Sequence, residues 1–265
     1  GQTNSGSSDA FVSKFNPDGT KEWTKLLGGS KNDFGNVITT GSDGSIYIVG
    51  TTEGDLNGQT NSGSSDAFVS KFNPDGTKVW IRLLGGSKHD FGNAITTGSD
   101  GSIYVAGKTF GDLDGQTNNR VRDYISKYHP DGTKLWTKIS NHSGNGDLVH
   151  IRINDDGSIF ALSSEESLLP CLGGWSCPNT IQSNNWFSKY DHNFNHEWSI
   201  DFKNNIKEEW RIDEWRIPSF AGAFTVSNDG TIYVVGSEFN DAVICKVNSD
   251  GSINWKEQLG SSISN

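Results

Sequence analysis

The sequence is dominated by an internal repeat. Residues 1–21 are identical to residues 58–78, which sets a period of 57 residues. Looser copies of the same segment begin at Asp123, Asn184 and Asp241. A tryptophan stands at or just after the end of each copy: Trp23, Trp80, Trp136, Trp198 and Trp255. Self-similarity at such a period predicts a stack of one small structural unit.

A second motif lies between successive copies of the first. It reads VITTGSDGSIYIVG from Val37 and AITTGSDGSIYVAG from Ala94, with looser copies from His150 and Phe224. Both motifs contain a turn-forming Asp-Gly between strand-favouring runs, and this combination is the signal of a β-hairpin. Each unit therefore contains two hairpins, and we name their four strands a to d.

The four strands differ in composition. Residues 37–40 typify strand a, 46–49 strand b, 10–15 strand c and 21–26 strand d. Strand b is apolar on both faces, which predicts sheets that bury both sides. Strand d mixes charged residues with one tryptophan, as expected of an outer edge. These features predict an all-β protein, a β-propeller of four-stranded antiparallel blades. A β-sandwich is the structural alternative, but it does not require a constant period.

Counting strands along the chain gives c and d, followed by four complete sets. About 4.5 blades are thus expected here, from a parent ring of about five to seven. We expect one propeller domain over residues 1–265, beginning in strand c, with an inserted b-c loop at 165–182 and an inserted d-a loop at 201–220. Phe194 stands where the other c-d turns carry glycine, so we expect that turn to be built differently.

Composition restricts the partners. The formal net charge of −10 argues against nucleic acid, whose phosphates require a basic surface. No apolar run approaches the roughly 20 residues that span a bilayer, so we expect a soluble chain without membrane insertion. The sequence begins in mid-repeat and without methionine. We therefore expect it to be a fragment or a processed product of a larger polypeptide.

The segment DAFVSKFNPDGTKEWTKLLGGSKNDFGNVITTGSDGSIYIVG, from Asp9, resembles the bacterial β-propeller repeat SBBP. The resemblance covers nearly the whole chain outside the two insertions. It implies a secreted or cell-surface bacterial protein, with no established catalytic residues to carry over. The segment before each tryptophan is also similar to the tryptophan-docking repeats of quinoprotein dehydrogenases. Asp250-Gly251-Ser252 resembles the Asp-box of sialidases, but its spacing differs from that motif.

Antiparallel order places the a-b and c-d turns at one end of each blade and the b-c and d-a loops at the other. The turns are nearly uniform, whereas both insertions lie at the loop end, so we expect ligands there. Aromatic and arginine side chains of the insertions are the candidate ligand-binding residues: Trp175, Trp210, Arg211, Trp215 and Arg216. Such residues suit sugar stacking or the anchoring of a protein partner. The alternative is that they cover a blade edge.

The b-c loops suggest a calcium site, and no other cofactor is expected. Oxygen-bearing side chains occur there at close spacing: Asp55, Asn57 and Asn61 in one loop, and Asp112, Asp114 and Asn118 in the next. Calcium prefers such a ligand density. The alternative is that these are ordinary turn residues, because the spacing is not that of an EF-hand.

Three cysteines are present. Cys171 and Cys177 bracket a turn-like stretch and could form a disulfide in an exported protein, the alternative being two separate thiols. Cys245 occupies the place of a strand-c serine in the other copies, so we expect a small buried side chain without chemistry.

The leading functional hypothesis is a non-catalytic module that binds a protein or glycan, or serves as a scaffold, through its loop end. The alternative is a carbohydrate-active enzyme, a glycosidase or lyase with carboxylates at the propeller axis. Asp33 and Asp90 enter strand a near that expected axis. We expect them to cap loops rather than line a catalytic channel.

Overall fold

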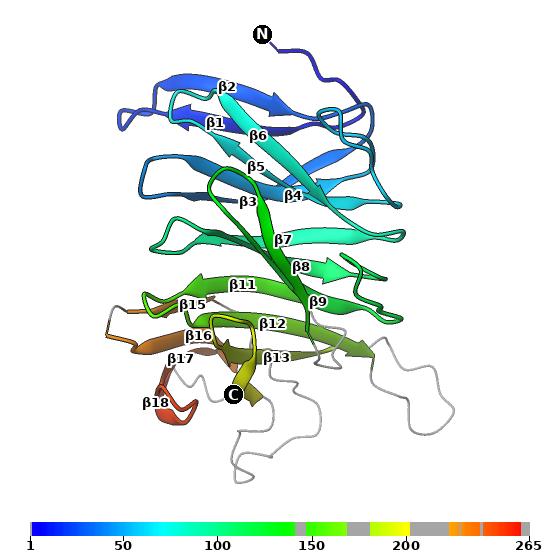
Figure 1. Ribbon diagram of the computed structural model, residues 1–265. Helices are drawn as coiled ribbons and strands as arrows, with labels where there is room; N and C mark the ends of the chain where they lie inside the picture. Colours follow the sequence, from blue (N-terminus) through cyan, green and yellow to red (C-terminus); the bar gives the residue numbers. More distant parts are fainter. Residues whose placement is uncertain are drawn as a thin grey trace. The chain divides into compact units, whose positions relative to one another are not determined.

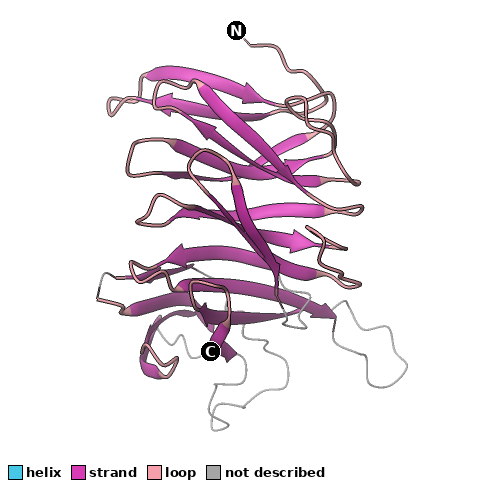
Figure 2. Cartoon of the chain, viewed as in Figure 1, coloured by secondary structure: helices cyan, strands magenta, loops and turns pink. Residues whose placement is uncertain are grey.

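The computed structural model describes residues 2–140, 147–168, 181–201, 223–227, 229–238 and 241–260. All regular structure in this part of the chain is β-strand (Figure 2). It therefore holds no helix that is long and apolar enough to cross a membrane. The chain divides into two compact units, residues 1–143 and 144–265, each of which is described by itself. The expectation of one domain stays a prediction.

The first unit contains a two-stranded and two four-stranded antiparallel sheets (Figure 1). The two-stranded sheet is β1 (Ala10–Phe15) and β2 (Lys21–Leu27). The next sheet is β3 (Asp33–Thr40), β4 (Ile46–Thr52), β5 (Asp66–Phe72) and β6 (Lys78–Leu84). The last is β7 (Asp90–Thr97), β8 (Ile103–Thr109), β9 (Arg122–Tyr128) and β10 (Lys134–Ile139). Strands pair in chain order, so β3 to β6 and β7 to β10 each run from a to d.

The second unit contains two further four-stranded antiparallel sheets. One is β11 (Asp147–Ile153), β12 (Ile159–Leu168), β13 (Ile181–Tyr190) and β14 (His196–Asp201). The other is β15 (Ala223–Val226), β16 (Ile232–Glu238), β17 (Asp241–Val247) and β18 (Ile253–Leu259). The predicted c-d hairpin followed by four a-b-c-d sets of propeller blades is thereby confirmed.

The boundaries of the predicted b-c insertion need correction. Glu165 pairs with Asn184 and Leu168 pairs with Ile181, so both ends of the predicted loop 165–182 belong to the β12-β13 hairpin. Residues 169–180 between the strands lie outside the described residues, as do 202–222 of the predicted d-a insertion.

Hydrophobic cores lie between successive sheets within each unit. In β4, Ile48 joins the core shared with β1 and β2, whereas its neighbour Val49 joins the core shared with β7 and β8. Both side chains are buried. Alternate residues of a strand point to opposite faces, so this strand is buried on both sides, as its sequence predicted. In the second unit, Phe187 of β13 and Phe224 of β15 share one core.

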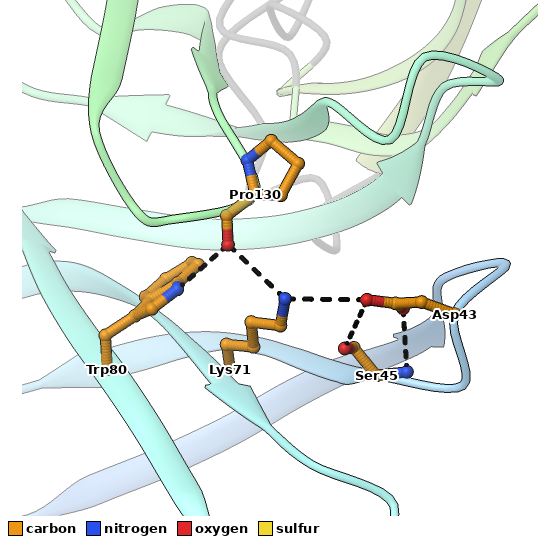
Figure 3. Close-up of polar contacts among 5 residues, drawn as sticks. All are labelled: Asp43, Ser45, Lys71, Trp80 and Pro130. Atoms are coloured by element: carbon orange, nitrogen blue, oxygen red, sulfur yellow. Dashed lines mark hydrogen bonds and ion pairs between the residues drawn. The ribbon is translucent and has the colours of Figure 1, made fainter.

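Strand-d tryptophans connect neighbouring sheets. The Trp80 indole Nε1 donates a hydrogen bond to the Pro130 carbonyl oxygen at 3.1 Å, and the Lys71 ammonium lies 3.4 Å from the same oxygen (Figure 3). A Cβ on Gly132, in the same c-d turn and with φ of +86°, would lie 2.8 Å from the Trp80 ring. Glycine is therefore required both by the conformation and by the close approach of the ring. Trp198 and Gly251 repeat this contact in the second unit.

The turn at Phe194 corrects our expectation of a different construction. Phe194 has φ of 63°, so it adopts the left-handed conformation that glycine adopts in the other copies. Its amide donates to the Asp191 carbonyl at 2.9 Å, matching the 2.9 Å bond from Gly76 to Asn73. The Phe194 ring stacks on Tyr190 with centroids 4.3 Å apart. This buried stacking offsets the steric cost of a left-handed non-glycine residue.

Hydroxyl pairs that are buried or half-buried connect strand c to strand d. Ser126 pairs with Thr137 at 2.7 Å, and Ser13 pairs with Thr24 at the same distance. In the next blade Ile81 stands where the first copy has Thr24, opposite Ser70. The buried Ser70 hydroxyl therefore has no hydrogen-bond partner. Cys245 occupies the equivalent place in β17 and is buried, as expected.

Aspartates cap the loops that lead into strand a. Asp33 Oδ2 accepts the Gly29 amide and Asp90 Oδ2 accepts the Gly86 amide, each at 2.7 Å. The side chains of Asp33 and Asp90 are buried, and this burial raises the pKa of both carboxyl groups. Loop capping, the role expected for both residues, is what the structure shows.

Two serine substitutions should have different effects on stability. Ser126→Ala removes the buried hydrogen bond between Ser126 and Thr137, while Thr137 keeps its contact with Asp114, and should lower the free energy of unfolding by about 1 kcal/mol. Ser70→Ala removes a hydroxyl that is already unpartnered, so its free energy of unfolding should equal or exceed that of the wild type. Chemical denaturation of both variants measures the difference. Equal losses in the two variants would contradict the assignment of these hydroxyl groups.

The buried Asp90 carboxyl should make stability depend on pH. Because its pKa is raised in the folded state, its contribution to stability is full below the unfolded pKa of about 4 and is lost as pH rises through the folded pKa. Asp90→Asn should therefore be more stable than the wild type at neutral pH, with an advantage that shrinks toward pH 4. Thermal denaturation across this pH range measures it.

Asp75→Asn is the control for this pH dependence. Hydrogen bonds from the backbone and side chain of Thr77 lower the pKa of Asp75, so this group stabilises the fold above its unfolded pKa. The Asp75→Asn variant should be less stable than the wild type at neutral pH, with a deficit that shrinks on acidification. The same trend in both variants would show that the burial of Asp90 is not the cause.

Candidate functional site

The predicted ligand-binding residues of the insertions lie outside the described residues: Trp175, Trp210, Arg211, Trp215 and Arg216. Cys171 and Cys177 lie outside them too. Both the aromatic site and the disulfide therefore stay predictions. The first unit holds two complete four-stranded blades among the described residues.

The predicted calcium ligands are engaged in loop contacts. Asp55 Oδ1 accepts the Asn61 amide at 2.9 Å, and Asp112 Oδ1 accepts the Asn118 amide at 2.6 Å. The Asn118 side chain donates to the carbonyl oxygens of Gly111 and Arg120. These bonds close each b-c loop on itself, which is the ordinary role of such turn residues.

A lysine contacts one further side-chain oxygen in each of these loops. The Lys78 ammonium donates to Asn57 Oδ1 at 2.9 Å, and Lys134 forms an ion pair with Asp114. Burial raises the pKa of Asp114, but hydrogen bonds from Lys134 and Thr137 outweigh this effect and leave it below its usual value. The calcium site at these loops stays a prediction. Among the described residues, no group of three or more His, Cys, Asp or Glu side chains is arranged to hold a metal.

A glutamine attaches each b-c loop to the outer strand of its blade. The Gln59 side chain donates to the Ile81 carbonyl at 2.8 Å and accepts the Leu83 amide at 3.1 Å, so it pairs with β6 as a neighbouring strand would. Gln116 makes the same pair of bonds to Thr137 and Ile139 of β10. These contacts cover part of an exposed edge. Sequence reasoning missed this role, although the glutamine recurs in each copy of GQTN.

The two described blades of the first unit differ at one end in a concerted way. Residues 1–57 and 58–114 differ at ten positions, and three of these lie together. Asn32, Thr51 and Glu53 in the first copy are replaced by His89, Lys108 and Phe110 in the second. These residues flank the start of strand a and the end of strand b, which is the end that carries the b-c and d-a loops.

The backbone is the same in both copies, while the side chains differ in chemistry. The Glu53 amide donates to the Asn32 carbonyl at 2.9 Å, and the Phe110 amide donates to the His89 carbonyl at 3.0 Å. In the first copy the Asn32 side chain donates to Glu53 Oε2 at 2.7 Å. The replacements convert this polar pair into an aromatic one.

In the second copy, four residues form what we term the aromatic patch: His89, Phe91, Lys108 and Phe110. The His89 and Phe91 rings are stacked with centroids 6.0 Å apart, and Phe110 contacts both edge-on. The Lys108 ammonium lies 5.6 Å from the Phe110 centroid, a cation-π distance. His89 Nδ1 lies 2.8 Å from the Ser65 hydroxyl, which orients the ring. His89 is exposed, whereas the other three residues are half-buried.

Two family models match the chain. The SBBP β-propeller repeat matches residues 22–57 and 79–114. A β-propeller domain of unknown function, DUF5122, matches residues 41–78 and 227–254. Both sets of matches follow the strand pattern described above.

Individual proteins match at low identity. Regulatory protein FlaEY of Caulobacter vibrioides is 28% identical over 201 residues, covering 70% of this chain and 21% of that protein. The uncharacterized WD repeat-containing protein L264 of Acanthamoeba polyphaga mimivirus is 24% identical over 198 residues, covering 59% and 14%. This chain thus spans about a fifth or less of these relatives. Two mutants of the Synechocystis apocarotenoid oxygenase match in structure at TM-scores of 0.48 and 0.47, with 13% and 12% identity, covering 93% of this chain and 55% of theirs.

Sequence, sheet topology and family models agree on the architecture. The repeat period found in the sequence corresponds to one four-stranded antiparallel sheet. Two of these periods are matched by the SBBP model, in the first unit. The chain is therefore a β-propeller repeat protein, in which two repeats match the SBBP family model.

Proposed function

We propose that this chain is a non-catalytic binding module, and that the loop end of its blades, including the aromatic patch, binds a protein partner. The observation that carries the proposal is the concerted replacement of Asn32, Thr51 and Glu53 by His89, Lys108 and Phe110 on the same backbone. Both sets of three residues are compatible with the same backbone, so the stability of the fold does not require the replacement. The change at the loop end therefore points to recognition.

The chemistry of the aromatic patch suits a protein surface. Aromatic side chains are enriched at the cores of protein interfaces. The patch presents them on a chain whose formal net charge is −10, so its local character departs from that of the whole molecule. The names of the two relatives, a regulatory protein and a WD repeat-containing protein, are compatible with a role in protein interaction. A glycan is the alternative ligand.

The polar residues of the repeats support a role without catalysis. Asp33 and Asp90, the candidate channel carboxylates, are engaged in capping the loops that enter strand a. Lys71 and Lys127 form ion pairs with Asp43 and Asp100 of the a-b turns. We further propose a secreted or cell-surface location, which rests on the SBBP resemblance alone.

A repeat-exchange variant tests the proposed binding surface. His89→Asn, Lys108→Thr and Phe110→Glu together give the second blade the residues of the first, which the same backbone already accommodates. Peptides selected from a display library against the wild-type chain should bind the triple variant at least about fivefold more weakly, the loss expected of an interface hot spot. Calorimetric titration measures the affinity.

The matched control exchanges strand-d residues in the same direction. Val79→Glu, Ile81→Thr and Arg82→Lys also restore first-repeat residues, but on β6. This variant should keep wild-type affinity for the selected peptides. Equal affinity of all three proteins would remove the aromatic patch from the proposal. Binding confined to a glycan array would replace the protein partner with a sugar.

A further inference from the structure

The two complete blades of the first unit differ in charge at the loop end. From the end of strand b to the start of strand c, residues 51–67 of blade β3–β6 carry three acids and no base, a formal charge of −3. The equivalent residues 108–123 of blade β7–β10 carry three acids and three bases, a formal charge of zero. The charge of this end thus differs by +3 between the two blades.

The strand register shows which replacements cause the difference. Arg122 on β9 takes the position that Asp66 has on β5, since the two lie opposite equivalent threonines of strand b. Two residues of the aromatic patch contribute as well, because Lys108 replaces a threonine and Phe110 replaces a glutamate. The aromatic patch is therefore part of a larger change in charge.

The charged side chains of this end are held by the blade itself. Arg122 Nη1 donates to a backbone carbonyl oxygen at 3.2 Å, and Lys108 lies opposite Asp123. Asp112 Oδ1 accepts a backbone amide at 2.6 Å, and Asp114 forms an ion pair with a lysine of strand d. Because these contacts fix the positions of the charges, the electrostatic field at this end is a property of the folded blade.

An exposed lysine lies beside the aromatic patch. The side-chain carbons of Lys88 lie against Gly111, where a Cβ would be 3.2 Å from Lys88 Cγ and Cδ. Gly111 directly follows Phe110 in the chain. Long cationic side chains rest their carbon stems on the protein and keep their charge in solvent. The Lys88 ammonium therefore reaches solvent at the rim of the patch.

The same lysine has a different neighbour in blade β3–β6. There Lys31 is exposed and lies against Gly54, but the residue before Gly54 is Glu53. The charge of Lys31 is thus placed beside an acid, whereas that of Lys88 is placed beside an aromatic ring. Of the two arrangements, the second presents a cation next to an apolar surface.

We propose that the aromatic patch binds an acidic segment of its protein partner. An apolar side chain of the segment packs on Phe91 and Phe110, and carboxylates beside it pair with Lys88 and Lys108. On a chain with a formal net charge of −10, the more positive end of this blade orients an acidic partner toward the patch. The inference rests on the proposed function and adds the chemistry of the partner.

Selection from a display library of peptides that contains acidic and basic residues in equal numbers tests the charge of the partner. The whole chain is the bait, and Phe110→Ala, which changes no charge, identifies the peptides that depend on the patch. We expect these peptides to be net acidic. Changing their aspartates and glutamates to asparagines and glutamines should weaken binding at least about tenfold by calorimetric titration, with a smaller loss at high salt.

Two lysine variants of the chain form a matched pair. Lys88→Gln and Lys31→Gln each remove one exposed cation that lies against a glycine of a b-c loop, so both variants should fold as the wild type does. Lys88→Gln should weaken the binding of the acidic peptides at least about threefold and reduce its salt dependence. Lys31→Gln should keep wild-type affinity.

Two results would overturn the inference and leave the proposed function standing. One is a set of patch-dependent peptides that are neutral or basic. The other is a set of acidic peptides that bind the Lys88→Gln and Lys31→Gln variants equally well. A library that yields no peptide sensitive to Phe110→Ala would instead remove the proposed function, and this inference with it.

Discussion

The burial of strand b on both faces is the constraint on which the rest of the structure depends. The adjacent residues Ile48 and Val49 project into different cores, so the side chains of β4 are buried only when a sheet packs on each of its faces. A sheet of this kind requires an apolar surface above and below it. The same requirement makes the repeats cooperative, because each unit supplies half of the core that its neighbour needs.

Polar side chains determine how the sheets are held at a given register. The contact of Trp80 with the Pro130-Gly132 turn, the glutamine that pairs with the outer strand and the aspartate caps all recur in corresponding places. Each is a hydrogen bond made by a side chain that recurs between the repeats. Other side chains at the loop end, such as His89, Lys108 and Phe110, differ from their counterparts in the first copy on the same backbone.

Much of the fold was predictable, because its signals are periodic and local. Strand c was predicted at residues 10–15, and β1 has these bounds. The turn at Phe194 was predicted wrongly, since a stacking contact with Tyr190 compensates for the missing glycine and no sequence pattern reports such a contact. The ends of the loop 165–182 were also wrong, because polar residues there continue the β12-β13 ladder.

The candidate site was less predictable than the fold. Comparison of residues 1–57 with 58–114 identifies the ten differing positions, but only the strand register shows that His89, Lys108 and Phe110 meet. Asp55 and Asp112 were predicted as calcium ligands from the close spacing of oxygen-bearing side chains in the b-c loops. Their hydrogen bonds to Asn61 and Asn118 depend on loop conformation, which the sequence pattern does not specify.

The identity of residues 1–21 and 58–78 has a consequence for folding. During collapse, either segment can pair with β4, because nothing in their side chains distinguishes one from the other. If residues 1–21 paired with β4 in place of residues 58–78, the sheets of one chain would assemble wrongly. If the same exchange occurred between two molecules, it would link them, as in domain swapping. Chain connectivity is what separates the correct pairing from these alternatives, because the short b-c loop at 53–65 gives the second segment a far higher local concentration beside β4.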